Sequence, residues 1–295
     1  MEQINAINII HFFNNNEMKS KVLLLAFVVL ALSAQAAPKI KTQHFEVEDS
    51  IRMFDKEDLQ GLGFKFTKTV SADWPVTVNG KKSKALNDFL VEEVFYASHN
   101  TQSFPKTPDD VKSLTGCVKN WVSYILRSNT MVQDYVVKEY GTPGVKDLNC
   151  NDEPMSCWYE TTDFKMSHTV GDLVFFVENG DCYYGGAHNT FGSTFLAYDA
   201  ALDKPIRVGD IVSNMSKVRR ILPSYDKRDK DNKWWQEIGE QDITNFYIKD
   251  GKMVFVFQPY MVGPFCDGIV EVPIPLKTLR AKRLLTTYGK KLVNL

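Results

Sequence analysis

The N-terminal half of the chain alternates between two hydrophobic periods. Apolar and polar residues alternate over residues 39–48 and 63–70, which predicts two strands, the second ending at Trp74-Pro75. Apolar residues then recur at helical spacing after Ser83 and again after Thr107-Pro108. These positions predict two helices, capped by Ser83 and Thr107, because a hydroxyl side chain accepts a hydrogen bond from the first helical turn.

From residue 156 onward the pattern is mainly that of strands. Aromatic and β-branched residues fill 156–170, 172–184 and 191–198, with a turn expected at Asn179-Gly180. Asp250-Gly251 predicts a hairpin. The remaining expected elements are a helix over 214–222, a charged exposed linker over 224–232, hairpin strands over 243–248 and 253–257, a last strand over 268–274 and a closing helix over 276–285.

This order of elements predicts an α+β fold, with antiparallel sheets, helices packed on one face and two subdomains. We place the N-terminal domain over residues 37–165 and the C-terminal domain over 166–295. The alternative is one continuous domain. No stretch repeats with a period that would indicate a solenoid or a propeller.

The first 36 residues predict export. Residues 18–36 combine a positive start, a short apolar run and an Ala-x-Ala site at 34–36, the order found in secretory signal peptides. Cleavage after Ala36 leaves 295 − 36 = 259 residues. The alternative is a buried core helix, and Met18 rather than Met1 is an alternative start. The apolar run is shorter than the roughly 20 residues of a membrane span, so we expect a periplasmic or secreted protein without a transmembrane anchor.

Composition narrows the classes of partner. The formal net charge of −1 gives no basic field for nucleic acid. The chain has five cysteines, and an exported compartment permits disulfides. Because five is odd, at least one thiol stays free or pairs between chains. No spacing of His and Cys indicates a metal site, and no motif indicates a cofactor.

Two glycine-containing segments are the candidate binding residues. In the first, Gly185 and Gly186 permit positive φ and place His188 at the edge of a turn; its candidates are Tyr184, Gly185, Gly186, His188 and Asn189. The second segment, residues 258–268, has two prolines and two glycines; its candidates are Tyr260, Phe265 and Asp267. The alternatives are a tight structural turn and a rigid crossover with inward aromatics.

The cysteines link these segments in one hypothesis. A Cys182–Cys266 disulfide would place the two loops side by side in the second sheet, and Cys150–Cys157 is the rival pairing. A catalytic Cys-His pair built on His188 is disfavoured, because oxidation would silence an exported free thiol. The paired Trp234-Trp235 suggests either stacking on a sugar ring or one core and one covering side chain.

These residues carry a family resemblance. The resemblance rests on Tyr184–Asn189 and on residues 206–211, 246–248, 254–260, 263–264, 268 and 270–275. Together they resemble the exported domain of unknown function found in the RsiV anti-sigma factor and at the non-catalytic end of PdaC-type peptidoglycan deacetylases. The match covers about residues 165–280. The resemblance implies an α+β fold and a cell-envelope setting, and it carries over no enzymatic residue. RsiV binds lysozyme, but the chain shows no recognisable sigma-binding part or deacetylase domain.

The sequence therefore predicts an exported, non-enzymatic binding module of the cell envelope. Its ligand would be peptidoglycan, another glycan, or an exported or host protein such as lysozyme. The alternative is an unrecognised cell-wall hydrolase that uses His188.

Overall fold

The structure is a computed structural model that describes residues 37–55, 64–96, 108, 110–128, 135–137, 157–228 and 233–294. Residues Pro38–Leu295 form one compact unit. The predicted signal peptide and the predicted cap Thr107 lie outside the described residues. Within the described residues, no helix combines the length and the apolar character that crossing a bilayer requires.

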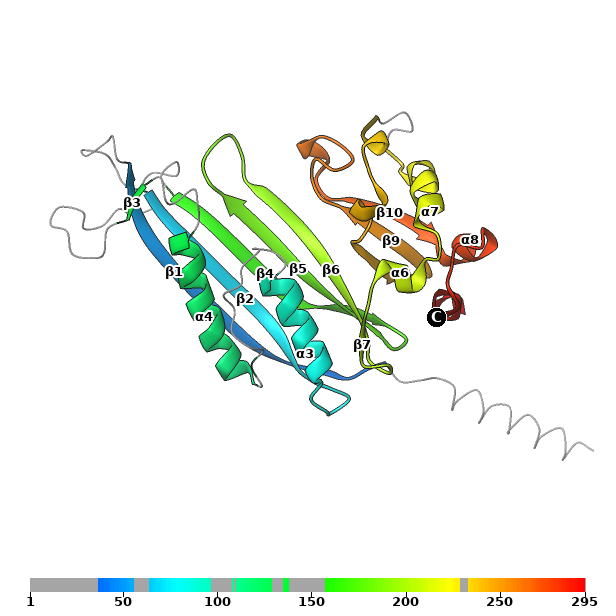
Figure 1. Ribbon diagram of the computed structural model, residues 1–295, viewed down its shortest axis with the longest axis horizontal. Coiled ribbons are helices and arrows are strands. Elements are labelled where there is room, and N and C mark those ends of the chain that lie inside the picture. Colours follow the sequence, from blue (N-terminus) through cyan, green and yellow to red (C-terminus); the bar gives the residue numbers. More distant parts are fainter. Residues whose placement is uncertain are drawn as a thin grey trace, which may run out of the picture. The chain divides into compact units, whose positions relative to one another are not determined.

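The larger sheet has seven strands in the order β3-β1-β2-β4-β5-β6-β7 (Figure 1). All its neighbours pair antiparallel except β2 and β4, which are parallel. The fold is α+β, as predicted, although one pair breaks the antiparallel pattern. The strands are β1 (Ile40–Asp55), β2 (Phe64–Val78), β3 (Tyr135–Val137), β4 (Cys157–Val170), β5 (Leu173–Tyr183), β6 (Thr190–Asp199) and β7 (Lys204–Ile206).

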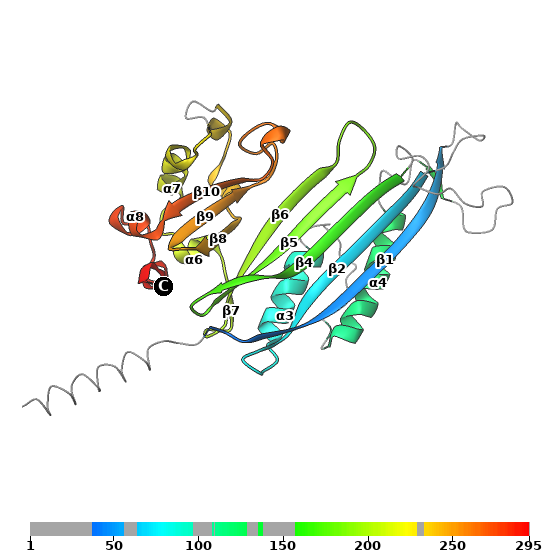
Figure 2. The same ribbon diagram turned by 180° about the vertical axis from the view of Figure 1, so that it is seen from behind.

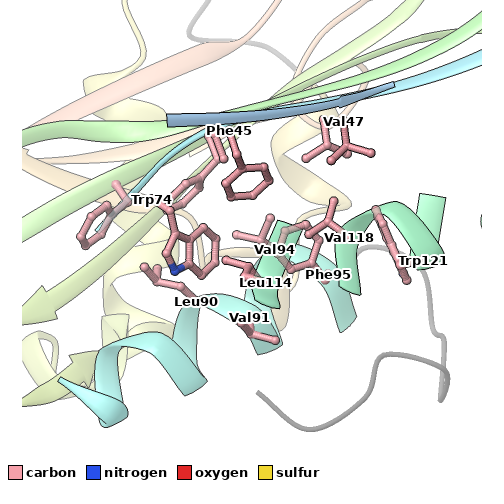
Figure 3. Close-up of a cluster of buried hydrophobic side chains, with 14 of the residues drawn as sticks. Phe45, Val47, Trp74, Leu90, Val91, Val94, Phe95, Leu114, Val118 and Trp121 are labelled. Carbon is pink, nitrogen blue, oxygen red and sulfur yellow. The ribbon is translucent and has the colours of Figure 1, made fainter. Parts of the chain in front are cut away.

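Two amphipathic helices cover one face of this sheet. Helix α3 (Lys84–Val91) starts at Ser83, whose hydroxyl accepts from the Leu86 amide at 2.9 Å, and continues into the π-helical turn η1 (Glu92–Tyr96). Helix α4 (Val111–Ser128) starts at Asp110, which accepts from the Ser113 amide at 2.9 Å. Such caps satisfy amides that the first helical turn leaves unpaired. The helices press apolar side chains onto those of β1 and β2 (Figure 3).

Strand β5 explains why this protein has two cores. Its run Leu173–Val177 is apolar at every position, and successive side chains point to opposite faces. Val174 and Phe176 pack in the core beneath the helices, while Leu173 and Phe175 pack in a second core. A strand buried on both faces needs such an unbroken apolar run.

The second core surrounds a three-stranded antiparallel sheet in the order β10-β9-β8. The predicted Asp250-Gly251 hairpin is confirmed, since it joins β8 to β9 with both residues at positive φ. The elements are β8 (Phe246–Lys249), β9 (Lys252–Phe257), β10 (Val270–Pro275), α6 (Val208–Ile211), α7 (Met215–Ile221), α8 (Leu276–Ala281), α9 (Thr287–Lys291), η3 (Leu222–Tyr225), η4 (Lys233–Gln236), η5 (Glu240–Asp242), η6 (Phe265–Asp267) and η7 (Leu292–Asn294).

Side-chain amides join the two sheets along β6. Strand β7 pairs with β6 only from Ala197 to Asp199, so the earlier part of β6 has no strand on that side. Gln258 accepts from the Ser193 amide (3.0 Å) and donates to its carbonyl (2.6 Å). Asn245 accepts from the Phe195 amide at 2.9 Å. These contacts supply the partners that an unpaired edge would lack.

Several sequence expectations are corrected by the strands. Trp74-Pro75 does not end β2, which stays paired with β1 as far as Val78. Strand β4 pairs with β2 only up to Ala72, so Pro75 removes no N–H from that pairing. Asn179-Gly180 is no turn; it lies inside β5, paired on both sides. The expected exposed linker contains Asp226, only 5% exposed. Residues 165 and 166, where we placed the domain boundary, lie inside β4.

Candidate functional site

The two glycine-containing loops meet. One joins β5 to β6 and the other joins β9 to β10, so they come from different sheets rather than from the second sheet alone. The His188 ring stacks on Phe265, with centroids 3.9 Å apart and planes 21° apart. The Tyr260 hydroxyl lies 3.2 Å from His188 Nε2, and Phe191 meets the edge of Phe265. The expectation that these loops lie side by side is confirmed.

We call the cluster His188, Phe191, Tyr260 and Phe265 the aromatic surface. Tyr260 is 52% exposed and His188 is exposed as well, so the cluster faces solvent. Large aromatic side chains grouped at the surface are typical of recognition sites. The alternative of inward-packed loop aromatics does not hold for Tyr260.

Backbone conformation shapes both loops. Gly185 and Gly186 have φ of +86° and +103°, a region that favours glycine, as the sequence indicated. Tyr260 has φ of +69°, which is uncommon for a bulky residue. Such strain costs of order 1–3 kcal/mol and is concentrated at functional sites. The second loop therefore holds Tyr260 in a conformation that its own preferences oppose.

His188 uses both ring nitrogens. Its Nδ1 lies 2.7 Å from the Asn189 carbonyl oxygen, which can only accept, so Nδ1–H donates. In the neutral ring Nε2 is then an acceptor for the Tyr260 hydroxyl at 3.2 Å. No carboxylate is among these partners. The geometry fits a histidine that holds two loops together better than one that takes protons from a substrate.

Arg228 holds the second loop, residues 258–268, in place through its guanidinium group. Arg228 donates to Asp267 at 2.6 Å, to the Val262 carbonyl at 3.0 Å and to Asp226 at 2.8 Å. Burial alone would raise the pKa of Asp226, but hydrogen bonds from Arg228 and from Trp235 hold that pKa below its ordinary value. Trp235 is buried and Trp234 is 37% exposed, so the tryptophan pair divides between core and surface.

Gly263 makes this anchor fit. A Cβ at this position would stand 2.3 Å from Asp267 Oδ2 and 2.7 Å from the Arg228 guanidinium. A larger residue here would force the Asp267 carboxylate and the Arg228 guanidinium to move from their present positions. Asp267, a predicted ligand-binding residue, therefore also serves to hold its own loop.

The polar partner of Asn189 lies on β5. Asn189 donates to Asp181 Oδ1 at 2.8 Å, and the Tyr159 hydroxyl lies 3.4 Å from Asp181 Oδ2. Tyr183 donates its hydroxyl to the Gly186 carbonyl at 3.0 Å. The sequence singled out neither Tyr159 nor Tyr183. The sequence signal for both tyrosines is strand parity. Odd-numbered side chains of β5, and of β4 before its register shift between Met166 and His168, point away from the helices.

Tyr184 points the other way. Its ring packs against Phe66 and Trp158 in the helix-covered core, and its hydroxyl donates to Glu160 at 2.8 Å. Although we predicted Tyr184 as a ligand-binding residue, its contacts are internal. One step along a strand exchanges the two faces of a sheet, which explains why Tyr183 and Tyr184 differ.

The same parity separates the two cysteines. Cys182 lies on the helix-covered side of β5, where burial, and after it the charge of Glu160, raises the pKa of its thiol. Cys266 is exposed on η6, next to Phe265, which packs on Phe191 at the opposite face. Both thiols are unbonded, so the structure does not contain the predicted Cys182–Cys266 disulfide. The rival pairing with Cys157 is not tested, because Cys150 lies outside the described residues.

A buried ionic cluster lies beneath the helices. Lys68 is 0% exposed, bonds Glu160 and has its ammonium 4.8 Å from the centre of the Trp121 ring. Burial lowers the pKa of Lys68, although Glu160 opposes this. Burial also raises the pKa of Glu178 to about 7, with Lys68 opposing and Glu93 adding to the rise. Charges removed from water need such partners.

Two cavities lie outside the aromatic surface. One, of about 410 Å³, is lined by Arg228, Asp267 and residues of the β8–β9 hairpin. The other, of about 430 Å³, lies between β2 and α3 beside Trp74 and Asn87. Both are large enough for a small molecule. Among the residues that the structure describes, no three His, Cys, Asp or Glu side chains group as metal ligands.

Comparison with known proteins supports the fold but indicates no function. Residues 198–277, from β6 to α8, match a family model described as a protein of unknown function, DUF3298. A crystal structure of a DUF3298 family member from Bacteroides fragilis is similar over 87% of this chain and 100% of that chain, with 17% identity and a TM-score of 0.54. One from Pseudomonas aeruginosa is similar over 85% and 96%, with 16% identity and a TM-score of 0.51. No curated protein matches the chain.

Proposed function

We propose that this protein is an exported, non-enzymatic binding module of the cell envelope. The observation that carries the proposal is the aromatic surface, where two loops from different sheets meet at a solvent-exposed position. Within it, Tyr260 is held at a strained φ. The resemblance to the exported part of RsiV and to the non-catalytic part of PdaC-type deacetylases supports the envelope setting. The ligand is a cell-wall glycan or an exported protein such as lysozyme.

Binding can be tested on isolated cell envelopes. The protein lacking residues 1–36 is mixed with an envelope fraction and sedimented. Tyr260→Ala and Phe265→Ala should each lose about tenfold in affinity, as expected for aromatic anchors at the centre of a contact. Tyr124→Ala is the matched control, because Tyr124 is an exposed tyrosine on α4. Equal binding by all three variants would refute the proposal.

The alternative, a hydrolase that uses His188, has a separate test. Purified protein is incubated with cell-wall fragments, and the soluble products are analysed by mass spectrometry. We expect no turnover, because both nitrogens of His188 are engaged by Asn189 and Tyr260. Turnover that His188→Ala abolishes would replace the binding proposal with an enzymatic one.

Export is part of the proposal. The positive, apolar and small-residue order of residues 18–36 supports removal of the leader after Ala36. Intact mass of the secreted or periplasmic product should show Ala37 as its first residue. A product that retains the apolar run would contradict it.

A further inference from the structure

We propose that the ligand is a glycan chain, and that it crosses a second aromatic site formed by Tyr159 and Tyr183 beside the aromatic surface. This inference rests on the proposed binding function and deepens it. It adds a site on the open face of the larger sheet and names the chemistry that would fill it.

The second site is a cross-strand pair. Tyr159 on β4 stands directly opposite Tyr183 on β5, and their rings stack with centroids 6.2 Å and planes 29° apart. Both residues are partly exposed. By their position in the strands they point away from the helices, and Figure 2 shows the sheet from the side without helices. Two partly exposed rings therefore lie together on the open face of the sheet, and we call this pair the tyrosine platform.

Polar groups connect this platform to the aromatic surface. Asp181 accepts from Asn189 at 2.8 Å and faces the Tyr159 hydroxyl at 3.4 Å. Tyr183 bonds the Gly186 carbonyl, two residues before His188. Asp181 and Asn189 therefore lie between the two groups of rings. A carboxylate offers about four lone-pair sites, so Asp181 retains acceptor capacity after these bonds.

This alternation of rings and polar groups matches the chemistry of a sugar chain. The negative face of an aromatic ring attracts the C–H bonds on the face of a pyranose. A carboxylate and an amide between the rings can bond adjacent hydroxyl groups. A nucleic acid would also stack on rings, but it needs cationic side chains for its phosphates. None of the residues that form the two ring groups or the Asp181–Asn189 connection is a lysine or an arginine.

Oligosaccharide length provides the test. Titration calorimetry compares the monosaccharide, disaccharide, tetrasaccharide and hexasaccharide of β-1,4-linked N-acetylglucosamine, with the matching glucose oligomers as a second series. Affinity should rise with length until the chain spans both ring groups. Tyr159→Ala and Tyr183→Ala should each lower the affinity for the long oligosaccharides about tenfold, equivalent to about 1.4 kcal/mol. Tyr159→Phe and Tyr183→Phe keep the rings and should keep most of that affinity.

The controls separate binding from folding. Thermal unfolding of each variant shows whether loss of the cross-strand pair unfolds the sheet, and the phenylalanine variants remain informative if the alanine variants unfold. Tyr124→Ala should bind as the unaltered protein does. Length-dependent binding that is unchanged in folded alanine variants would overturn the second site.

Failure of this inference is distinguishable from failure of the proposed function. If neither oligomer series binds, but sedimentation with envelopes persists after the glycans are digested, the ligand is a protein and the glycan inference is wrong. If the protein binds neither oligomers nor envelopes, both proposals are wrong.

Discussion

The polar side chains on the two faces of the sheet around β5 differ in how far they are buried. On the helix-covered face, Lys68 and Glu160 form a buried ion pair, and the charge of Lys68 also acts on Glu178. On the open face, Asp181 and Tyr183 bond residues of the loop between β5 and β6 and remain partly exposed. Charge alone would have marked the buried face as the functional one. The difference teaches that available hydrogen-bonding capacity, rather than charge, marks a surface that can bind.

The largest effect should come from breaking the buried pair. Glu160→Ala leaves the Lys68 ammonium without its main partner and removes the acceptor of Tyr184. Removing one member of a buried pair costs about 3–5 kcal/mol, measurable by urea unfolding. The double variant Lys68→Met/Glu160→Leu should recover most of that loss. Asp163→Ala breaks an exposed pair with Lys165 and should cost under about 1 kcal/mol.

A double variant as unstable as Glu160→Ala alone would contradict this account. The cluster would then stabilise the fold beyond the pairing of its charges, and the contrast between the two faces of β5 would weaken.

The anchor beneath the aromatic surface should give the next largest effect. Arg228→Ala leaves the Asp226 carboxylate, in a residue only 5% exposed, with the Trp235 indole and the backbone amide of residue 228 as donors. We expect a loss of about 2–3 kcal/mol in unfolding free energy, the cost of an under-paired buried group. Envelope binding should fall as well, because Asp267 and the Val262 carbonyl lose their donor. Arg127→Ala, on the exposed side of α4, is the control for both measurements.

Arg228→Lys sharpens this prediction. A lysine has one point charge and cannot bond Asp226, Asp267 and Val262 in the planar geometry of the guanidinium. Recovery of both stability and binding by lysine would show that charge alone suffices.

Glu178 should make the helix-covered core sensitive to pH. Its pKa is raised from 4.5 to about 7 by burial. Between these values the folded chain holds a proton that the unfolded chain has lost, so this contribution is complete below pH 4.5 and disappears as pH rises through 7. The charges that act on Glu178 are those of Lys68 and Glu93, and Lys68 in turn interacts with Glu160 and Cys182.

The measurement is urea unfolding at pH 5 and pH 8. Glu178→Gln should be less sensitive to this change than the unaltered protein by about 1–2 kcal/mol, a value reduced for partial exposure. Glu46→Gln, an exposed position on β1, is the control. Identical pH dependence in all three proteins would contradict the raised pKa.

Local signals predicted much of the fold. Ser83 marked the start of α3, and Asp250-Gly251 marked the β8–β9 hairpin. The same local rules failed at Asn179-Gly180 and Trp74-Pro75, because pairing with neighbouring strands decides there. The parallel pairing of β2 with β4 joins residues 92 positions apart at Lys68 and Glu160, a separation at which turn and period signals give no information.

The candidate site was predictable only in part. Glycines and aromatics pointed to His188, Tyr260 and Phe265, which the structure brings together. The face of the sheet toward which each side chain points was harder to predict, because Tyr184 and Cys182 lie on the buried side. Arg228 lay in a charged stretch that looked like an exposed linker. Its role depends on Asp267, 39 residues away, and no local pattern encodes that contact.

The smallest effect concerns the strained backbone at Tyr260. At φ of +69°, Tyr260→Gly relieves the left-handed strain, whereas Tyr260→Ala keeps it. Glycine also raises the entropy of the unfolded chain, which offsets part of the gain. We expect the glycine variant to be more stable than the alanine variant by about 1 kcal/mol in urea unfolding. Both should lose envelope binding, since neither carries the ring. An alanine variant as stable as the glycine variant would show that the loop relaxes without Tyr260. If instead the glycine variant is the more stable one while binding stays lost, Tyr260 is held at this φ for recognition, at the expense of stability. The buried cluster on the other face of β5 shows the opposite case, since its pairing serves the stability of the fold.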